Sequence, residues 1–398
     1  MNFNLSEKGL QISPSVTLEI TAKAKAMKAE GIDVISFGAG EPDFNTPENI
    51  RKEGIRAIEE GLTRYTPASG ITELKEAVCK KFKEENHLNY SPSNIVISNG
   101  AKHSISNALM AILNPLDEVI IAVPYWVSYP EMVKISGGTP VYVHTKEEND
   151  FKFTVSDLDK VLTDKTKAII LNSPSNPTGS IYTKEELTEI ANWAVENNIF
   201  VISDEIYEKL VYDGEHISIA SINEDIKNLT IVINGMSKAY AMTGWRIGYA
   251  AANEKIAKVM SNIQSHTTSN PCSISQYASL VGLLGDQSNV EEMRVQFEKR
   301  RDYMVETINN INGLSCRKPR GAFYIMVNIT QIKGKTINGV NINSSLDFAK
   351  VLLDKAKVAV IPGIGFGDDD YIRLSYATSM ENIEVGLKRI KDMVENIA

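Results

Sequence analysis

The strongest constraint on the fold is a set of short, unbroken apolar runs that alternate with helical patterns between residues 93 and 249. Ala168–Leu171 and Phe200–Ile202 are two of these runs. Strands that are apolar on both faces are typical of a parallel sheet covered by helices on both sides. The sequence therefore predicts an α/β fold with a mostly parallel central sheet. The predicted strands are Asn94–Ser98, Glu118–Val123, Lys167–Asn172, Phe200–Ser203 and Thr230–Asn234, and predicted helices include Ala101–Leu113 and Lys184–Asn197.

The pattern changes after about residue 285, where a long charged helix begins. Strand candidates and a final amphipathic helix follow, which predicts a smaller α+β domain. The length of 398 residues also favours two domains, and the cleft between them is the default place for a ligand site. We expect residues 1–45 to pack with the small domain, residues 46–285 to form the large domain and residues 286–398 to form the small one. The C-terminal elements are Val290–Ile308, Ala322–Val327, Val358–Ile361 and the helix from Asn382.

The net charge of -8 disfavours partners that need a basic surface. Nucleic-acid phosphates and anionic lipids are such partners, so we expect neither. The apolar runs are much shorter than the roughly 20 residues of a membrane helix. The N-terminal residues also lack the apolar run of a signal peptide, so we expect a cytoplasmic protein.

Polar residues follow four of the predicted strands at their carboxyl ends, where α/β sheets bind ligands. A helix that begins at Gly100 offers free N–H groups to an anion, and Arg246 can grip a phosphate with two hydrogen bonds. Lys238 can act as a nucleophile if burial beside cations lowers its pKa. The four segments are Ser98–Lys102, Asn172–Gly179, Ser203–Tyr207 and Asn234–Lys238.

These segments resemble one family in sequence order. Ser237–Tyr249 (SKAYAMTGWRIGY) resembles the cofactor-lysine segment of class I/II aminotransferases, which bind pyridoxal 5'-phosphate (PLP) and have PLP fold type I. Asn176–Gly179, Ser203–Tyr207 and Tyr371–Ser375 are similar to other motifs of that family. Within it, Pro124–Tyr129 (PYWVSY) is most similar to bacterial and archaeal-type aspartate aminotransferases. The similarity extends over nearly the whole chain.

The resemblance implies that Lys238, Asp204 and Tyr207 are catalytic. Lys238 would hold PLP as a Schiff base and move the proton of the substrate α-carbon. Asp204 would keep the pyridine nitrogen protonated, because a nearby carboxylate favours the charged form. Tyr207 and Asn176 would hydrogen-bond the ring hydroxyl oxygen. The implied cofactor-binding residues are Tyr65, Gly100, Ala101, Lys102, Trp126, Asn176, Asp204, Tyr207, Ser237, Lys238 and Arg246.

The resemblance also implies a substrate site and a partner. Arg373 would bind the substrate α-carboxylate in a two-pronged grip that lysine cannot reproduce. Lys102 would face the side-chain carboxylate of a dicarboxylic substrate. Tyr65 matches a tyrosine that reaches the phosphate of the neighbouring subunit, which implies a homodimer with shared active sites. The implied substrate-binding residues are Gly40, Lys102, Trp126, Asn176 and Arg373.

The expected activity is a ping-pong transfer of the amino group of L-aspartate to 2-oxoglutarate, which gives oxaloacetate and L-glutamate. Three alternatives stay open: an aminotransferase for aromatic substrates, prephenate or alanine, a PLP lyase on the same scaffold, and a PLP-binding transcriptional regulator. Glu7 and Lys8 stand where some dual-specificity relatives carry arginine, which disfavours prephenate. The acidic charge disfavours the regulator.

Other motifs are incomplete. Gly334–Thr336 ends like a P-loop but lacks its leading glycine, and Gly38–Asp43 has aspartate at the last glycine of a dinucleotide fingerprint. The five histidines share no ligand spacing, so we expect no metal. The family resemblance further implies cis peptide bonds at Val123-Pro124 and Asn176-Pro177.

Overall fold

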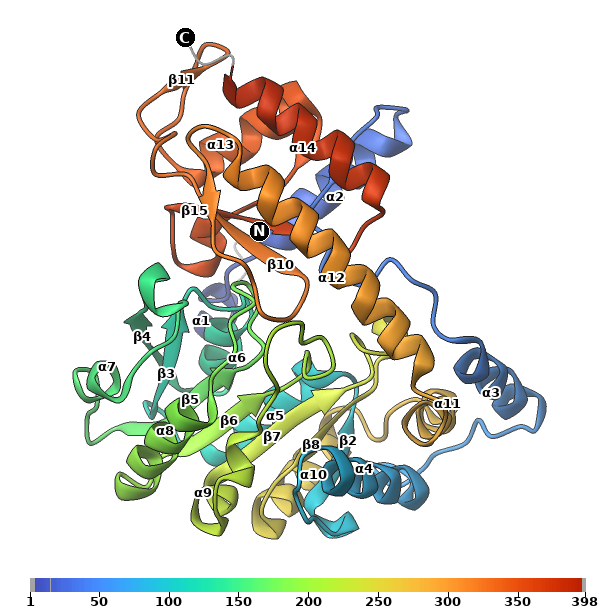
Figure 1. Cartoon of the computed structure of the whole chain (residues 1–398). Helices are drawn as coiled ribbons and strands as arrows, with labels where there is room; N and C mark the ends of the chain where they lie inside the picture. Colours follow the sequence, from blue (N-terminus) through green and yellow to red (C-terminus); the bar gives the residue numbers. More distant parts are fainter. Residues whose placement is uncertain (1–3, 15, 396–398) are drawn as a thin grey trace.

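A seven-stranded sheet forms the centre of the larger lobe, which occupies the lower half of Figure 1. The computed structural model describes residues 4–14 and 16–395. The strand order is β2-β8-β7-β6-β5-β3-β4, and within this sheet β8 alone runs antiparallel to its neighbours. The prediction of a mostly parallel sheet is therefore confirmed. The strands are β2 (Ile95–Ser98), β3 (Glu118–Val123), β4 (Thr139–His144), β5 (Thr166–Asn172), β6 (Phe200–Asp204), β7 (Thr230–Gly235) and β8 (Gly248–Ala251).

Helices cover both faces of this sheet, as β5 illustrates. Successive strand residues point to opposite faces. Ile169 is fully buried in a cluster with Trp193 of α8 (Lys184–Glu196), whereas Ile170 is buried in a second cluster with Leu109 of α5 (Ala101–Ile112). Burying one such side chain stabilises the fold by about 1.5–3 kcal/mol, which explains the unbroken apolar runs. The remaining helices of this lobe are α3 (Glu48–Glu59), α4 (Thr72–Glu85), α6 (Tyr129–Ile135), α7 (Val155–Asp159), α9 (Glu224–Leu229), α10 (Glu254–Thr267) and α11 (Ser273–Leu284).

The smaller lobe is built on a four-stranded antiparallel sheet of order β14-β15-β10-β9. In Figure 1 the long helix α12 runs from this lobe down toward α11. Where the sequence suggested one strand from Val358 to Ile361, two short strands form and join different sheets. The elements are α12 (Ser288–Asn309), β9 (Ser315–Cys316), β10 (Tyr324–Asn328), β11 (Thr336–Ile337), β12 (Val340–Asn341), α13 (Ser345–Val351), β13 (Val358–Ala359), β14 (Ile361–Pro362), β15 (Tyr371–Ser375) and α14 (Met380–Glu395).

The N-terminal segment contains α1 (Glu7–Leu10), α2 (Val16–Ala29) and β1 (Ile35–Ser36). β1 pairs in parallel with β13, and α2 lies beside the smaller lobe in Figure 1. The division at residues 45/46 and 285/286 stays a prediction. Among the described residues, we find no helix with the length and apolarity needed to cross a membrane.

Three X-Pro peptide bonds in the described part of the chain are cis. The bonds at Val123-Pro124 and Asn176-Pro177 agree with the resemblance, and Ser173-Pro174 was not expected from the sequence.

Candidate active site

A cavity of about 740 Å³ lies where the carboxyl ends of β5, β6 and β7 face the smaller lobe. Parallel strands bring the residues that follow them to one edge of a sheet, so segments distant in sequence meet there. Of the predicted site residues, all except Tyr65 and Gly100 line this cavity. The predicted residues that line it are Gly40, Ala101, Lys102, Trp126, Asn176, Asp204, Tyr207, Ser237, Lys238, Arg246 and Arg373.

Lys238 follows β7, and its ammonium group donates a hydrogen bond to the carbonyl oxygen of Gly40. Burial, helped by the positive charges of Arg373 and Arg246, lowers the pKa of Lys238 to about 8 against the opposing effects of Glu41 and Asp204. A substantial fraction of the amine is therefore neutral near pH 8, as a nucleophilic lysine requires.

Asp204 ends β6 and is 3% exposed. One carboxylate oxygen accepts a hydrogen bond from the Tyr129 hydroxyl at 2.7 Å, and the other accepts the N–H of Ile206 at 3.2 Å. Burial raises the pKa of Asp204 to about 6 despite these two donors. A cation beside this carboxylate would favour its ionised form. Tyr129 ends the Pro124–Tyr129 motif, but the resemblance assigned it no role in the site.

The start of α5 forms a candidate anion cradle. Gly100, its N-cap, has a φ of 89°, and a Cβ there would lie 2.3 Å from Nη2 of Arg246. Gly248 is equally restricted, because its Cβ would lie 2.2 Å from the backbone nitrogen of Ala101. Helix N–H groups beside an arginine and the hydroxyl of Ser237 suit a phosphate. The donor set therefore fits the phosphate group of PLP.

Arg373 lies on β15 and is 2% exposed. Its Nη1 donates to Asn176 at 3.0 Å and its Nη2 donates to the carbonyl of Gly38 at 3.2 Å. Its buried Nε has no hydrogen-bond partner among the described residues. Because a buried donor without an acceptor is costly, this arginine suits an anionic ligand that completes its hydrogen bonding.

Tyr324 of β10 connects this arginine to the predicted cofactor residues. The Arg373 guanidinium lies 4.3 Å from the centroid of the Tyr324 ring. The Tyr324 hydroxyl lies 2.9 Å from the Tyr207 hydroxyl. Sequence reasoning missed Tyr324, because a tyrosine in a strand resembles any core aromatic.

The cavity has the opposite charge to the whole chain. Six cationic side chains and two acidic ones from the described residues line it, which leaves an excess of four positive charges in a chain of net charge -8. Lys102 is one of the six, and its ammonium lies 5.0 Å from the Trp126 ring centroid. This potential favours anionic ligands with more than one negative group. The charged lining residues are Lys25, Lys28, Lys102, Lys238, Arg246, Arg373, Glu41 and Asp204.

Tyr65 lies outside the cavity and is 91% exposed. Two buried glutamines hold its loop: Gln276 donates to the Thr66 hydroxyl at 3.0 Å, and Gln264 donates to the carbonyl of Ala68 at 2.5 Å. A large aromatic side chain on a firmly held loop is suited to contact with another chain.

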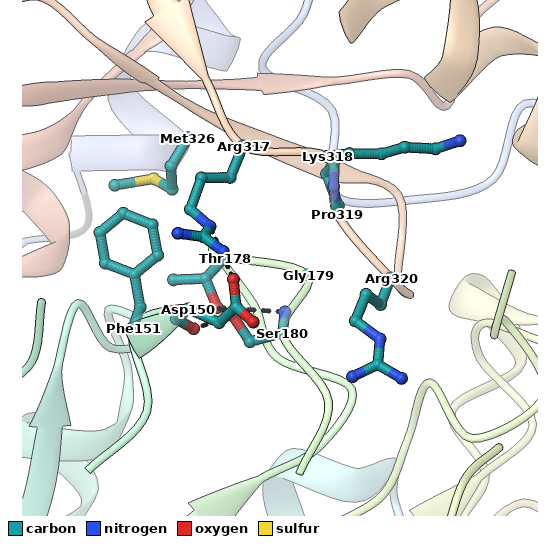
Figure 2. Close-up of a pocket in the computed structure, with 10 residues that line it drawn as sticks. All are labelled: Asp150, Phe151, Thr178, Gly179, Ser180, Arg317, Lys318, Pro319, Arg320 and Met326. Carbon is teal, nitrogen blue, oxygen red and sulfur yellow. Dashed lines mark hydrogen bonds and ion pairs between the residues drawn. The ribbon is translucent and has the colours of Figure 1, made fainter. Parts of the chain in front are cut away.

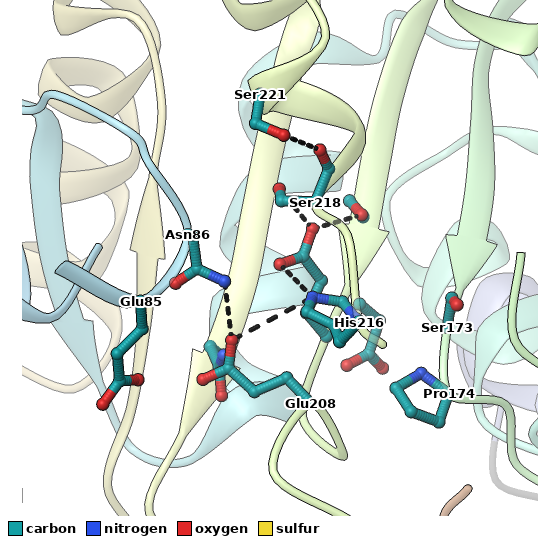
Figure 3. Close-up of polar contacts among 12 residues, drawn as sticks. Glu85, Asn86, Ser173, Pro174, Glu208, His216, Ser218 and Ser221 are labelled. Carbon is teal, nitrogen blue, oxygen red and sulfur yellow. Dashed lines mark hydrogen bonds and ion pairs between the residues drawn. The ribbon is translucent and has the colours of Figure 1, made fainter. Parts of the chain in front are cut away.

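The segment that follows β6 contributes residues to a buried polar cluster, whose contacts Figure 3 shows. Glu205, Glu208 and His216 each offer one possible metal-ligand atom, and these atoms lie within 4.8 Å of one another. However, the buried ammonium of Lys81 already contacts Glu208, and the Ser218 hydroxyl donates to Glu205 at 2.7 Å. This cation supplies the charge that a metal would bring, so we interpret the cluster as an ion-pair network. The absence of a metal stays a prediction.

A small pocket lies at the junction of the two lobes (Figure 2). Its volume of about 10 Å³ is near that of one water molecule. Arg317 pairs with Asp150 at 2.6 Å, and the N–H groups of Arg320 and Gly321 donate to the carbonyl of Gly179 at 3.0 and 2.9 Å. These contacts join Asp150 and the loop after β5 to the smaller lobe, and the pocket is too small for a substrate.

Comparison with known proteins assigns the family. The family model "Aminotransferase class I and II" matches residues 32–390. An aspartate aminotransferase of Bacillus sp. (strain YM-2) is 52% identical over 392 residues, which cover 98% of this chain and 99% of that protein. A probable aspartate/prephenate aminotransferase of Aquifex aeolicus (strain VF5) is 46% identical over 400 residues, covering 100% of both. The crystal structure of the aspartate aminotransferase from Rhizobium meliloti has a TM-score of 0.96 at 42% identity and covers 100% of both chains. The chain therefore belongs to the class I and II aminotransferases.

Proposed function

We propose that this aminotransferase binds PLP and transfers the amino group of L-aspartate to 2-oxoglutarate, forming oxaloacetate and L-glutamate. The observation that supports this most directly is one cavity lined by the amine of Lys238 and by two further cations, Arg373 and Lys102. An amine that is partly neutral suits cofactor attachment, and two cations suit a dicarboxylic substrate. The Bacillus relative is named for the same substrate.

In this proposal the phosphate of PLP is held by the start of α5, Ser237 and Arg246. Tyr207 and Asn176 hydrogen-bond the ring hydroxyl oxygen, and Trp126 stacks on the ring. When bound, PLP supplies an electron-withdrawing ring that stabilises negative charge at the substrate α-carbon.

The chain's own residues then orient the substrate and move its proton. Arg373 binds the α-carboxylate, using the Nε that lacks a partner among the described residues. Lys102 binds the distal carboxylate, and the backbone at Gly40 contacts the same substrate. Lys238 removes the proton from the α-carbon as a neutral amine, and Asp204 stabilises the protonated ring nitrogen.

A homodimer completes the proposed site. The exposed Tyr65 has no role in the cavity of its own chain, and its loop is held by buried hydrogen bonds. We therefore propose that Tyr65 of the partner subunit reaches the phosphate. The cytoplasmic location stays a prediction.

Absorption spectroscopy of the PLP-loaded protein tests the proposal. Aspartate, glutamate, alanine, phenylalanine and prephenate-derived arogenate are added singly, and 2-oxo acids are added afterwards. We expect aspartate and glutamate to change the cofactor spectrum at the lowest concentrations and 2-oxoglutarate to reverse the change.

Three results would contradict the proposal. A folded protein that never acquires the absorbance of lysine-bound PLP has a different cofactor. Release of ammonia instead of amino transfer indicates a lyase. A response at lower concentration to arogenate than to aspartate makes the prephenate reaction the main one.

A further inference from the structure

The carboxylate of Asp204 has a second partner in addition to the main chain. Tyr129, at the first turn of α6, is 3% exposed and donates its hydroxyl proton to Oδ2 of Asp204 at 2.7 Å. Its ring also meets the Trp126 ring edge-on, with 5.2 Å between centroids. One short segment thus provides both the aromatic side chain at the cavity wall and the donor to Asp204.

The surroundings of Asp204 make this donor important. Burial opposes the negative charge, Glu205 is a neighbouring carboxylate, and Lys238 is a neighbouring cation. Tyr207 is also a close neighbour: burial raises the pKa of its hydroxyl, and the negative charge of Asp204 contributes to this rise. Burial also raises the pKa of Tyr129 well above its ordinary value, so its hydroxyl remains a proton donor.

We propose that Tyr129 is a positioning residue that keeps the Asp204 carboxylate ionised and aimed at the ring nitrogen of PLP. This inference rests on the proposed function. A neutral hydroxyl is suited to the task, because it stabilises the carboxylate without cancelling its charge. A lysine or arginine at the same position would also keep Asp204 ionised. Its positive charge would, however, offset the negative charge of the carboxylate and weaken the attraction between Asp204 and a protonated ring.

A purely structural role for Tyr129 makes a different prediction. Tyr129 also belongs to the apolar cluster beneath the sheet, so its ring alone contributes to packing. Tyr129→Phe keeps that ring and removes only the hydroxyl. If packing were the whole role, any loss of cofactor affinity in this variant would be independent of pH.

The test measures PLP binding by the full chain after removal of its cofactor, using fluorescence titration from pH 5.5 to 8.5. The proteins are wild type, Tyr129→Phe and a matched control, Tyr376→Phe, which removes another buried hydroxyl that donates to the Ala322 carbonyl at 3.1 Å. The ratio of variant to wild-type dissociation constants is compared at each pH, because contributions common to both proteins cancel.

We expect Tyr129→Phe to bind PLP about as well as wild type at pH 8.5, roughly fivefold more weakly near pH 6 and still more weakly at pH 5.5, which corresponds to a rise of about one unit in the pKa of Asp204. The control should show no such pH-dependent ratio. A ratio near one at every pH, or a constant loss at every pH, overturns the proposal.

A double-mutant cycle with Asp204→Asn keeps the test decisive if Tyr129→Phe alone is less stable. In the Asp204→Asn background the hydroxyl has no carboxylate to stabilise, so removing it should add no pH-dependent loss. A persisting loss refutes the role of Tyr129. Failure of wild type to bind PLP at all refutes the proposed function instead.

Discussion

Replacing Lys102 by methionine is the sharpest test of the aspartate preference. Methionine has a similar length and no charge, so the change removes the proposed partner of the distal carboxylate. Two opposite charges about 4 Å apart attract by about 4 kcal/mol at an effective dielectric constant of 20. The Lys102 side chain is exposed in the structure, so solvent screening reduces this attraction, and we take about half of it. The remaining ~2 kcal/mol corresponds to a loss of roughly 30-fold in kcat/KM.

The assay follows oxaloacetate formation from aspartate and 2-oxoglutarate, and the half-reaction with alanine is followed by absorbance. Alanine has no distal carboxylate, so its kcat/KM should change less than about threefold in Lys102→Met. Lys80→Met, an exposed lysine on α4 whose nearest carboxylate lies 4.0 Å away, is the matched control and should leave both substrates unaffected. An equal loss for aspartate and alanine would show that Lys102 acts on the cofactor or the fold. An unchanged rate with aspartate would refute its role.

Three further predictions concern other charges. Because burial lowers the pKa of Lys238 to about 8 and only its neutral amine reacts, covalent attachment of PLP to the cofactor-free chain should accelerate as pH rises to about 8 and then level off; a rate that still climbs up to pH 10 contradicts this. The double variant Lys25→Gln/Lys28→Gln should lower kcat/KM for aspartate several-fold at low ionic strength and much less in about 0.5 M salt, where screening removes long-range attraction; a loss independent of salt excludes steering. Burial alone would raise the pKa of Glu208, but the attraction of Lys81 is stronger than this effect, and the pKa falls to about 2. Ionised Glu208 therefore stabilises the fold fully above pH 4.5, and this stabilisation is lost as the pH falls toward 2. Glu208→Gln should therefore cost about 3–5 kcal/mol in denaturant unfolding at pH 7, and a smaller cost at pH 7 than at pH 3 would contradict the assignment.

The parts of the fold that the sequence predicted are those with a local signal. β5 and β6 were visible because each buries apolar side chains on both faces. β4 was missed because it lies at the sheet edge, has exposed residues and contains Pro140. β8 was missed because it is short, three of its four residues are glycine or alanine, and it begins inside the cofactor-lysine motif, where nothing local indicates a reversed strand direction. Edge position and strand direction are set by contacts with distant parts of the chain.

The candidate site likewise contains residues that have a local sequence signal and residues that have none. The residues proposed to touch the cofactor or substrate follow strands or lie in motifs, and the structure brings all of them except Tyr65 and Gly100 to one cavity. The two tyrosines that the sequence did not assign to the site each form a hydrogen bond with one of those residues: Tyr129 with Asp204 and Tyr324 with Tyr207. Both are buried aromatics on other elements: Tyr129 ends the Pro124–Tyr129 motif but received no role from the resemblance, and the sequence around Tyr324 does not distinguish it from an ordinary core residue. A neutral buried donor such as the Tyr129 hydroxyl has no charge pattern in the sequence and no fixed spacing from its partner. The contribution of Tyr129 to the ionisation of Asp204 is therefore visible only in the fold, which brings the start of α6 against the end of β6.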